Sequence, residues 1–70
     1  MFWAIFNKYG VLHFTISYRR VDAIDKAFEG GLPSQQFVAK KDRTKADRDR
    51  MWRFLKKRGA YAAKCEVVEV

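Results

Sequence analysis

Apolar residues recur every second position in two N-terminal stretches of the chain. Residues 2–7, FWAIFN, are apolar on both alternating faces, which is typical of a central strand. Residues 11–18, VLHFTISY, instead separate into an apolar face (Leu12, Phe14, Ile16 and Tyr18) and a polar face (His13, Thr15 and Ser17). This alternation predicts a half-buried strand. Residues 8–10 predict a hairpin turn between the two strands, because Gly10 can adopt a positive φ.

The apolar period then changes to that of a helix in two further segments. Residues 19–29 place Val21, Ile24 and Phe28 on one face and Asp22, Asp25 and Glu29 on the other, and Gly30-Gly31 predicts the C-terminal end. Residues 45–58 form the second predicted helix, which Gly59 ends. Thr44 and Asp47 have the spacing of an N-cap and an acidic third residue, a variant of the capping box.

The remaining segments complete a single α+β domain over residues 1–70. Residues 34–43 fit a strand, a helix or a loop, and we interpret them as an irregular connection anchored by Phe37 and Val38. Residues 60–69 return to period two, with an inward face predicted at Tyr61, Ala63, Cys65 and Val67. The order ββ(α)αβ predicts a mainly antiparallel three-stranded sheet in the order 2-1-3, with two helices packed on one face.

Length and composition exclude several classes of protein. Seventy residues suffice for one small domain, whose thin core is supplemented by six Phe, three Tyr and two Trp. The single cysteine, Cys65, precludes an intramolecular disulfide and favours a cytoplasmic location. One cysteine and one histidine cannot build a closed zinc site, so we expect no metal and no cofactor. No apolar run approaches the length of a membrane span.

The net charge of +7 is concentrated in one segment. Residues 40–58 contain ten of the fifteen Lys and Arg residues and three of the eight Asp and Glu residues, so this segment carries the whole excess. On a helical wheel, Phe54, Met51, Leu55 and Trp52 span about 160°, and cations occupy the opposite side. We therefore predict a partner- or phosphate-binding surface. Its expected members are Lys40, Lys41, Arg43, Arg50, Arg53, Lys56 and Lys57.

An alternative interpretation is a solvated, ion-paired helix face. Asp49 lies four residues from both Lys45 and Arg53, and Asp47 lies three residues before Arg50. Such pairs contribute only about 0.2–0.5 kcal/mol each. Three aspartates cannot neutralise ten cations, which favours the anion-binding interpretation.

Other residues that carry chemistry have structural explanations. Trp3 and Phe2 point to opposite faces of one strand, so we expect one of the two rings to be exposed, and we assign this to Trp3. An exposed ring would mark a contact with a partner or a second copy of the chain. The alternative is that residues 34–43 cover it. His13 fits a solvated side chain, and Cys65 a small buried one. No nucleophile, P-loop or metalloprotease motif occurs, so we expect no enzymatic activity.

Three segments resemble small phage- and prophage-encoded proteins that take over host machinery or counter host defence, including anti-CRISPR-like proteins. They are FWAIFNKYGVL, FTISYRRVDAIDKAF and MWRFLKKRGAYAAKCEVVEV. The resemblance implies a non-enzymatic protein that inhibits or adapts a nucleic-acid-processing or defence complex in the host cytoplasm. The basic helix would contact an acidic protein surface of that complex. The alternative is a small nucleic-acid-binding protein that contacts phosphates with the same helix.

Overall fold

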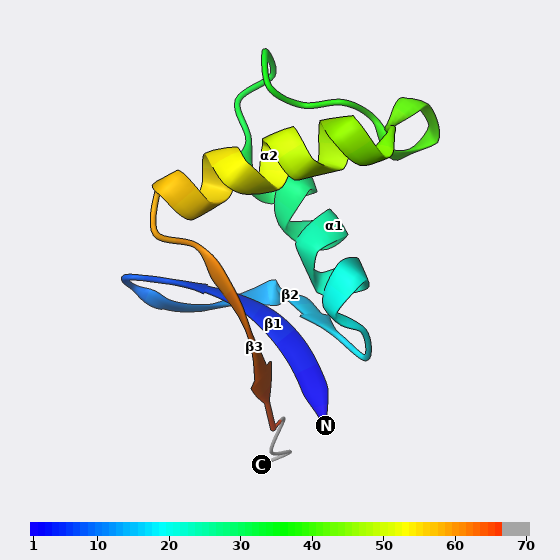
Figure 1. The fold of residues 1–70 in the computed structure, drawn as a ribbon. Coiled ribbons are helices and arrows are strands. Elements are labelled where there is room, and N and C mark those ends of the chain that lie inside the picture. Colours follow the sequence, from blue (N-terminus) through cyan, green and yellow to red (C-terminus); the bar gives the residue numbers. More distant parts are fainter. Residues whose placement is uncertain (67–70) are drawn as a thin grey trace.

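A computed structural model of the protein describes residues 1–66 and combines a three-stranded antiparallel sheet with two helices (Figure 1). In chain order the elements are β1 (Phe2–Asn7), β2 (Gly10–Ser17), α1 (Arg20–Gly31), a short 3-10 helix η1 (Lys40–Asp42), α2 (Lys45–Lys57) and β3 (Tyr61–Cys65). The predicted α+β class, element order and strand order 2-1-3 are confirmed. Residues 67–69 of the predicted last strand lie outside the described residues.

The core lies between the sheet and the helices. Central strand β1 places Ile5 opposite Leu12 of β2 and Ala62 of β3, and all three side chains contribute to the helix side of the sheet. The fully or nearly fully buried members of this cluster are Ile5, Ala23, Ile24, Ala27, Phe28, Met51 and Leu55. Helix α1 packs along the sheet, and α2 crosses α1 and adds Met51 and Leu55 (Figure 1).

A bulge in β2 changes which side chains the sheet buries. Trp3 of β1 pairs with Ser17 of β2, and Ile5 of β1 pairs with Leu12 of β2. Between these two pairs β1 has one residue, Ala4, whereas β2 has four, so β2 bulges out of the regular ladder. The Thr15 hydroxyl lies inside the bulge. It accepts a hydrogen bond from the Ile5 N–H (2.9 Å) and donates one to the Leu12 carbonyl (2.6 Å).

The bulge makes the predicted strict alternation of β2 wrong. Thr15 and Ser17, predicted on the polar face, are buried, whereas Phe14 and Tyr18 are exposed. Extra residues in one strand shift the facing of every later side chain. The predicted inward face of β3 is also wrong. Regular pairing with β1 places Ala62 against the core and Tyr61 on the outer side of the sheet.

The glycines confirm one predicted helix end and correct another. Gly59 has a φ of 95° and follows α2 as predicted. Gly30 and Gly31, in contrast, belong to α1, which continues to Gly31. A Cβ on Gly30 would lie 2.7 Å from the Phe14 ring, so Gly30 permits close contact between α1 and β2.

Candidate anion-binding surface

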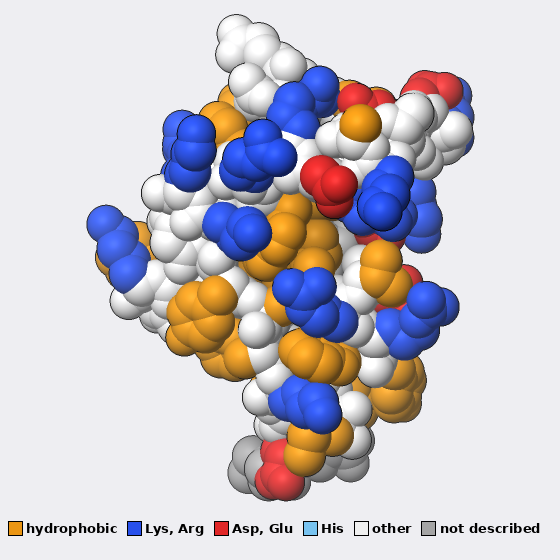
Figure 2. All heavy atoms as spheres, in the orientation of Figure 1, with side chains coloured by type: hydrophobic (Ala, Val, Ile, Leu, Met, Phe, Trp, Pro, Cys, Tyr) orange, Lys and Arg blue, Asp and Glu red, His pale blue; other side chains and the backbone are white. Residues whose placement is uncertain are grey.

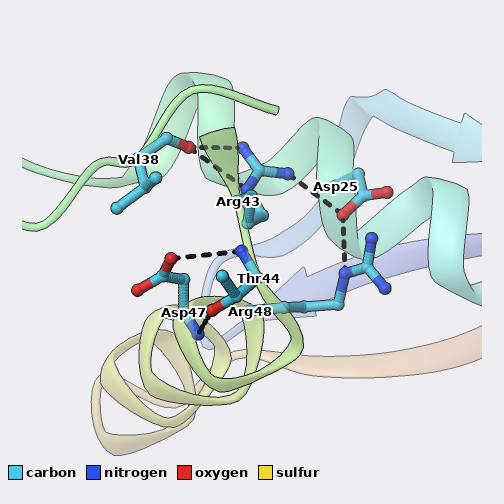
Figure 3. A network of polar contacts seen from close by, with 6 residues as sticks. All are labelled: Asp25, Val38, Arg43, Thr44, Asp47 and Arg48. Atoms are coloured by element: carbon cyan, nitrogen blue, oxygen red, sulfur yellow. Dashed lines mark hydrogen bonds and ion pairs between the residues drawn. The ribbon is translucent and has the colours of Figure 1, made fainter. Parts of the chain in front are cut away.

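The N-terminus of α2 is fixed by a capping box, as its sequence predicts. The Thr44 hydroxyl accepts a hydrogen bond from the Asp47 N–H, and the Asp47 carboxylate accepts one from the Thr44 N–H, each at 3.1 Å (Figure 3). Hydrogen bonding from Thr44 to the carboxylate, chiefly from the Thr44 backbone N–H, holds the pKa of Asp47 below its ordinary value, and the nearby Arg50 acts in the same direction. The cap therefore fixes where the helix begins.

The inner side of α2 determines which of its residues face solvent. Met51 and Leu55 are buried, and Trp52 and Phe54 are half-buried against the core, as the helical wheel predicts. Trp52 is therefore part of the packing and does not project as a free ring. The opposite side, which includes Arg53, Lys56 and Lys57, is exposed.

Arg43, a predicted member of the binding surface, is instead a buried structural residue. Its side chain is only 2% exposed. One terminal nitrogen, Nη1, donates to Asp25 of α1 at 3.1 Å, while Nε and Nη2 donate to the Val38 carbonyl at 3.2 and 2.9 Å (Figure 3). The guanidinium also lies 4.9 Å from the centre of the Phe28 ring. The prediction for Arg43 is wrong because its side chain is buried and each of its three guanidinium nitrogens donates a hydrogen bond inside the protein.

The carboxylate of Asp25 joins three parts of the chain. Arg48 of α2 places its Nε 3.3 Å from the same oxygen that Arg43 contacts, so two guanidinium groups share one carboxylate (Figure 3). Asp25 was predicted to lie on the solvent face of its helix, yet it is buried. Its spacing of three residues from Phe28 was the one sequence signal that it could face inward.

Four of the predicted residues do form a common surface, here called the α2 cation face: Arg50, Arg53, Lys56 and Lys57. All four are exposed. Arg50 lies 3.6 Å from Asp47, with half of its side chain exposed. Among residues 1–66, Arg53, Lys56 and Lys57 make no ion pair. The surface is thus smaller than predicted, but three of its cations keep their charge uncompensated.

Lys40 and Lys41 are exposed but lie away from the centre of this face. They belong to η1, which precedes α2, whereas Lys56 and Lys57 are at the far end of the helix (Figure 1). A helix of thirteen residues spans about 20 Å. Figure 2 shows the corresponding side of the molecule, where Lys and Arg side chains are distributed between apolar patches and outnumber Asp and Glu.

Sequence reasoning missed two features beside the α2 cation face. Arg58 extends it at the helix end, where its guanidinium lies 4.7 Å from the centre of the Phe54 ring. A shallow hollow lies beside the same ring. It is lined by Gln36, Arg50, Arg53, Phe54 and Lys57. Gln36 comes from the irregular connection, whose position relative to α2 no local pattern in the sequence indicates.

The expectation that Trp3 is the uncovered ring is wrong. Trp3 is half-buried and packs against the core on the helix side, with Lys64 Nζ 5.6 Å from its ring centre. Phe2 points to the opposite side of the sheet, where it contacts Tyr18.

Comparisons with known proteins add no assignment: no family model, curated protein or solved structure matches this chain. Within residues 1–66, no helix is both long and apolar enough to cross a membrane. The same residues contain no group of three or more His, Cys, Asp or Glu side chains that could hold a metal ion.

Proposed function

We propose that this protein is a non-catalytic binding module whose α2 cation face contacts the phosphates of nucleic acid. One observation carries the proposal. Some arginines of this region already pair with Asp25 or Asp47. Arg53, Lys56 and Lys57 do not, and they project from one side of a helix whose other side is anchored by Met51 and Leu55. Residues three and four apart on a helix are neighbours, so these cations can meet adjacent charges of a polyanion.

The composition of this face favours nucleic acid over protein as the partner. Protein interfaces centre on desolvated aromatic and apolar side chains and are depleted in lysine. None of the exposed large apolar side chains of residues 1–66 belongs to α2. Phosphate contacts need no such apolar centre, because the release of counterions supplies most of their free energy.

The contacts of the Asp25 and Asp47 carboxylates support the non-catalytic part of the proposal. The Asp25 carboxylate is occupied by Arg43 and Arg48, and that of Asp47 caps α2. Both carboxylates therefore have a role in the fold.

Binding to nucleic acid can be measured by fluorescence anisotropy with a labelled duplex of about 20 base pairs at several salt concentrations. With four phosphate contacts, log K is expected to fall against log salt with a slope of about −3.6. In the variant Arg53→Gln/Lys57→Gln the slope should become shallower by about 2. The matched control Lys8→Gln/Arg19→Gln removes two exposed cations outside α2 and should keep the slope of the wild type. Absence of binding at low salt, or binding without salt dependence, would refute the proposal.

A second candidate is the inhibitor or adaptor of a host nucleic-acid-processing or defence complex, acting by steric occlusion. The hollow beside Phe54 favours it, because three cations there surround an aromatic ring and could receive an acidic side chain of a protein partner. Affinity capture from host extract distinguishes the two candidates. A defined partner that is retained after nuclease treatment, and lost with Arg53→Gln/Lys57→Gln, would support the second candidate; loss of all partners after nuclease would exclude it.

A further inference from the structure

The hollow beside Phe54 lies where α2 meets the irregular connection between the helices. Its lining residues are Gln36, Arg50, Arg53, Phe54 and Lys57, and its volume is about 190 Å³. The three cations are three, four and seven residues apart on α2, so they lie along one side of the helix. Among residues 1–66, no carboxylate lines this hollow, which we call the Phe54 hollow. A small anion is therefore the kind of ligand whose charge fits it.

The α2 side of the hollow is held in place by contacts within the protein. Phe54 is half-buried against the core, and the Arg58 guanidinium lies 4.7 Å from the centre of its ring. Arg50 Nη1 lies 3.6 Å from one carboxylate oxygen of Asp47, and the other oxygen accepts the hydrogen bond from the Thr44 N–H. The capping box thus orients Arg50 as well as starting the helix. Groups that are positioned in advance lose less entropy when a ligand binds.

Gln36 supplies a neutral hydrogen-bond donor from a second segment of the chain. Its backbone N–H donates to the Pro33 carbonyl at 2.9 Å, and two residues later the Val38 carbonyl is held by Arg43. Both contacts fix the course of the connection past the hollow. Within residues 1–66, the half-buried side-chain amide of Gln36 makes no hydrogen bond. It is therefore available to donate to an oxygen of a ligand.

The charge and the donors of the Phe54 hollow match a phosphate that ends a strand. Asp47 pairs with Arg50, which leaves the charges of Arg53 and Lys57 uncompensated. A terminal phosphate carries a charge of about −1.5 to −2 at pH 7 and has three free acceptor oxygens. A carboxylate or an internal phosphodiester carries one charge and has two free oxygens, so it would leave more of these donors without an acceptor.

We propose that the Phe54 hollow binds the terminal phosphate of a nucleic-acid strand. Arg53 and Lys57 pair with its charge, and Gln36 donates to an oxygen that these cations leave free. This inference rests on the proposed function and defines its ligand more narrowly, as the end of a strand and not only a run of internal phosphates. Lys56 belongs to the α2 cation face but does not line the hollow, so it is left to contact an internal phosphate.

The test uses labelled duplexes of one sequence whose ends carry a hydroxyl, a 5′-phosphate or a 3′-phosphate, with the full chain at low salt. In fluorescence anisotropy, one of the phosphorylated ends should bind roughly tenfold or more tightly than the hydroxyl end, because one hydrogen bond to a charged group contributes that much. Lys57→Gln should abolish this preference. Gln36→Leu, which leaves the net charge unchanged, should reduce it.

Lys56→Gln is the matched control for Lys57→Gln. It removes the same charge from the neighbouring residue, outside the hollow, and should weaken the binding of all three duplexes alike. Circular dichroism confirms that each variant is folded.

Failure of this inference and failure of the proposed function give different results. If the three duplexes bind equally and the salt dependence persists, or if Lys56→Gln removes the preference as fully as Lys57→Gln, the Phe54 hollow is not the site and the α2 cation face stands. If the wild type binds none of the duplexes, both fail. If a phosphoserine peptide binds, and is lost with Lys57→Gln, while no duplex binds, the partner is a protein and the nucleic-acid assignment is overturned.

Discussion

At the scale of single residues, Arg43 and Asp25 show how a cation from a basic segment becomes part of the fold. A buried guanidinium is tolerated only when its hydrogen-bond donors find acceptors, and Arg43 finds them in Asp25 and the Val38 carbonyl. The contact attaches the irregular connection to α1, because Val38 and Arg43 both belong to the segment between the helices. The same contact removes Arg43 from any external surface.

Asp25→Asn should therefore destabilise the protein strongly. Removing one partner of a buried ion pair costs about 3–5 kcal/mol, because it leaves the other charge uncompensated. The free energy of unfolding can be measured by urea titration. Asp22→Asn is the matched control, since Asp22 makes only an exposed pair with Arg19 at 4.0 Å and should change stability by less than about 1 kcal/mol.

The double variant Asp25→Asn/Arg43→Met sharpens this prediction. It should be more stable than Asp25→Asn alone, because the buried guanidinium of Arg43 is removed together with its partner, which leaves only the partly exposed Arg48 without a carboxylate. An Asp25→Asn protein as stable as the wild type, or a double variant that is simply the sum of its parts, would contradict the proposed role of the pair.

Thr15 is the second residue whose role depends on an unusual hydrogen bond. In Thr15→Val, the buried Ile5 N–H loses its acceptor inside the bulge, which should cost about 1–3 kcal/mol in a urea titration. Hydrogen exchange of the Ile5 amide should accelerate in the same variant. Thr15→Ser retains the hydroxyl oxygen and should keep this amide protected; equal exchange in both variants would show that the hydroxyl is not the acceptor that matters.

At the scale of elements, α2 depends on a cap whose charge can be titrated. The pKa of Asp47 is lower in the folded protein than the ordinary 3.8, so the unfolded state binds more protons and this contribution to stability increases with pH. It is fully present above the ordinary pKa and is lost as the pH falls through the folded value. The stability difference between wild type and Asp47→Asn should therefore shrink in acid.

Urea titrations at neutral pH and below pH 3.8 measure this difference. Asp49→Asn is the matched control, because Asp49 lies on the exposed side of the same helix and does not cap it. A difference between wild type and Asp47→Asn that does not change with pH would show that the charge of Asp47 does not contribute to the cap.

The positions of the strands and helices were largely predictable from the sequence. Which of their side chains face the core was less predictable. The strand and helix positions follow from local periodicity, and the start of α2 follows from the Thr44–Asp47 spacing. The bulge between Trp3 and Ile5 was not predictable, because an alternating strand gives no local sign of where its partner skips residues. That one irregularity reversed the facing of Thr15 and Tyr18.

At the scale of the whole molecule, the net charge of +7 should oppose folding by self-repulsion. We expect the Tm of the wild type to rise by a few degrees as salt screens this repulsion, since about 1 kcal/mol corresponds to roughly 4–8 °C in so small a domain. Lys56→Glu/Lys57→Glu lowers the net charge by four and should show a smaller rise. A Tm that falls with salt would mean that ion pairs outweigh the repulsion.

The sequence by itself determined the order of the three strands and two α-helices, the cap of α2 and the excess of positive charge on the segment 40–58, because periodicity and charge count are properties of neighbouring residues. It did not indicate η1, which lies in the segment interpreted as irregular. Tertiary structure alone decided which cations stay free and which aromatic rings stay uncovered. Arg43 and Asp25 are eighteen residues apart, and the β2 bulge exists only relative to β1. Burial and pairing between distant residues depend on how the elements pack, and no local pattern encodes that packing.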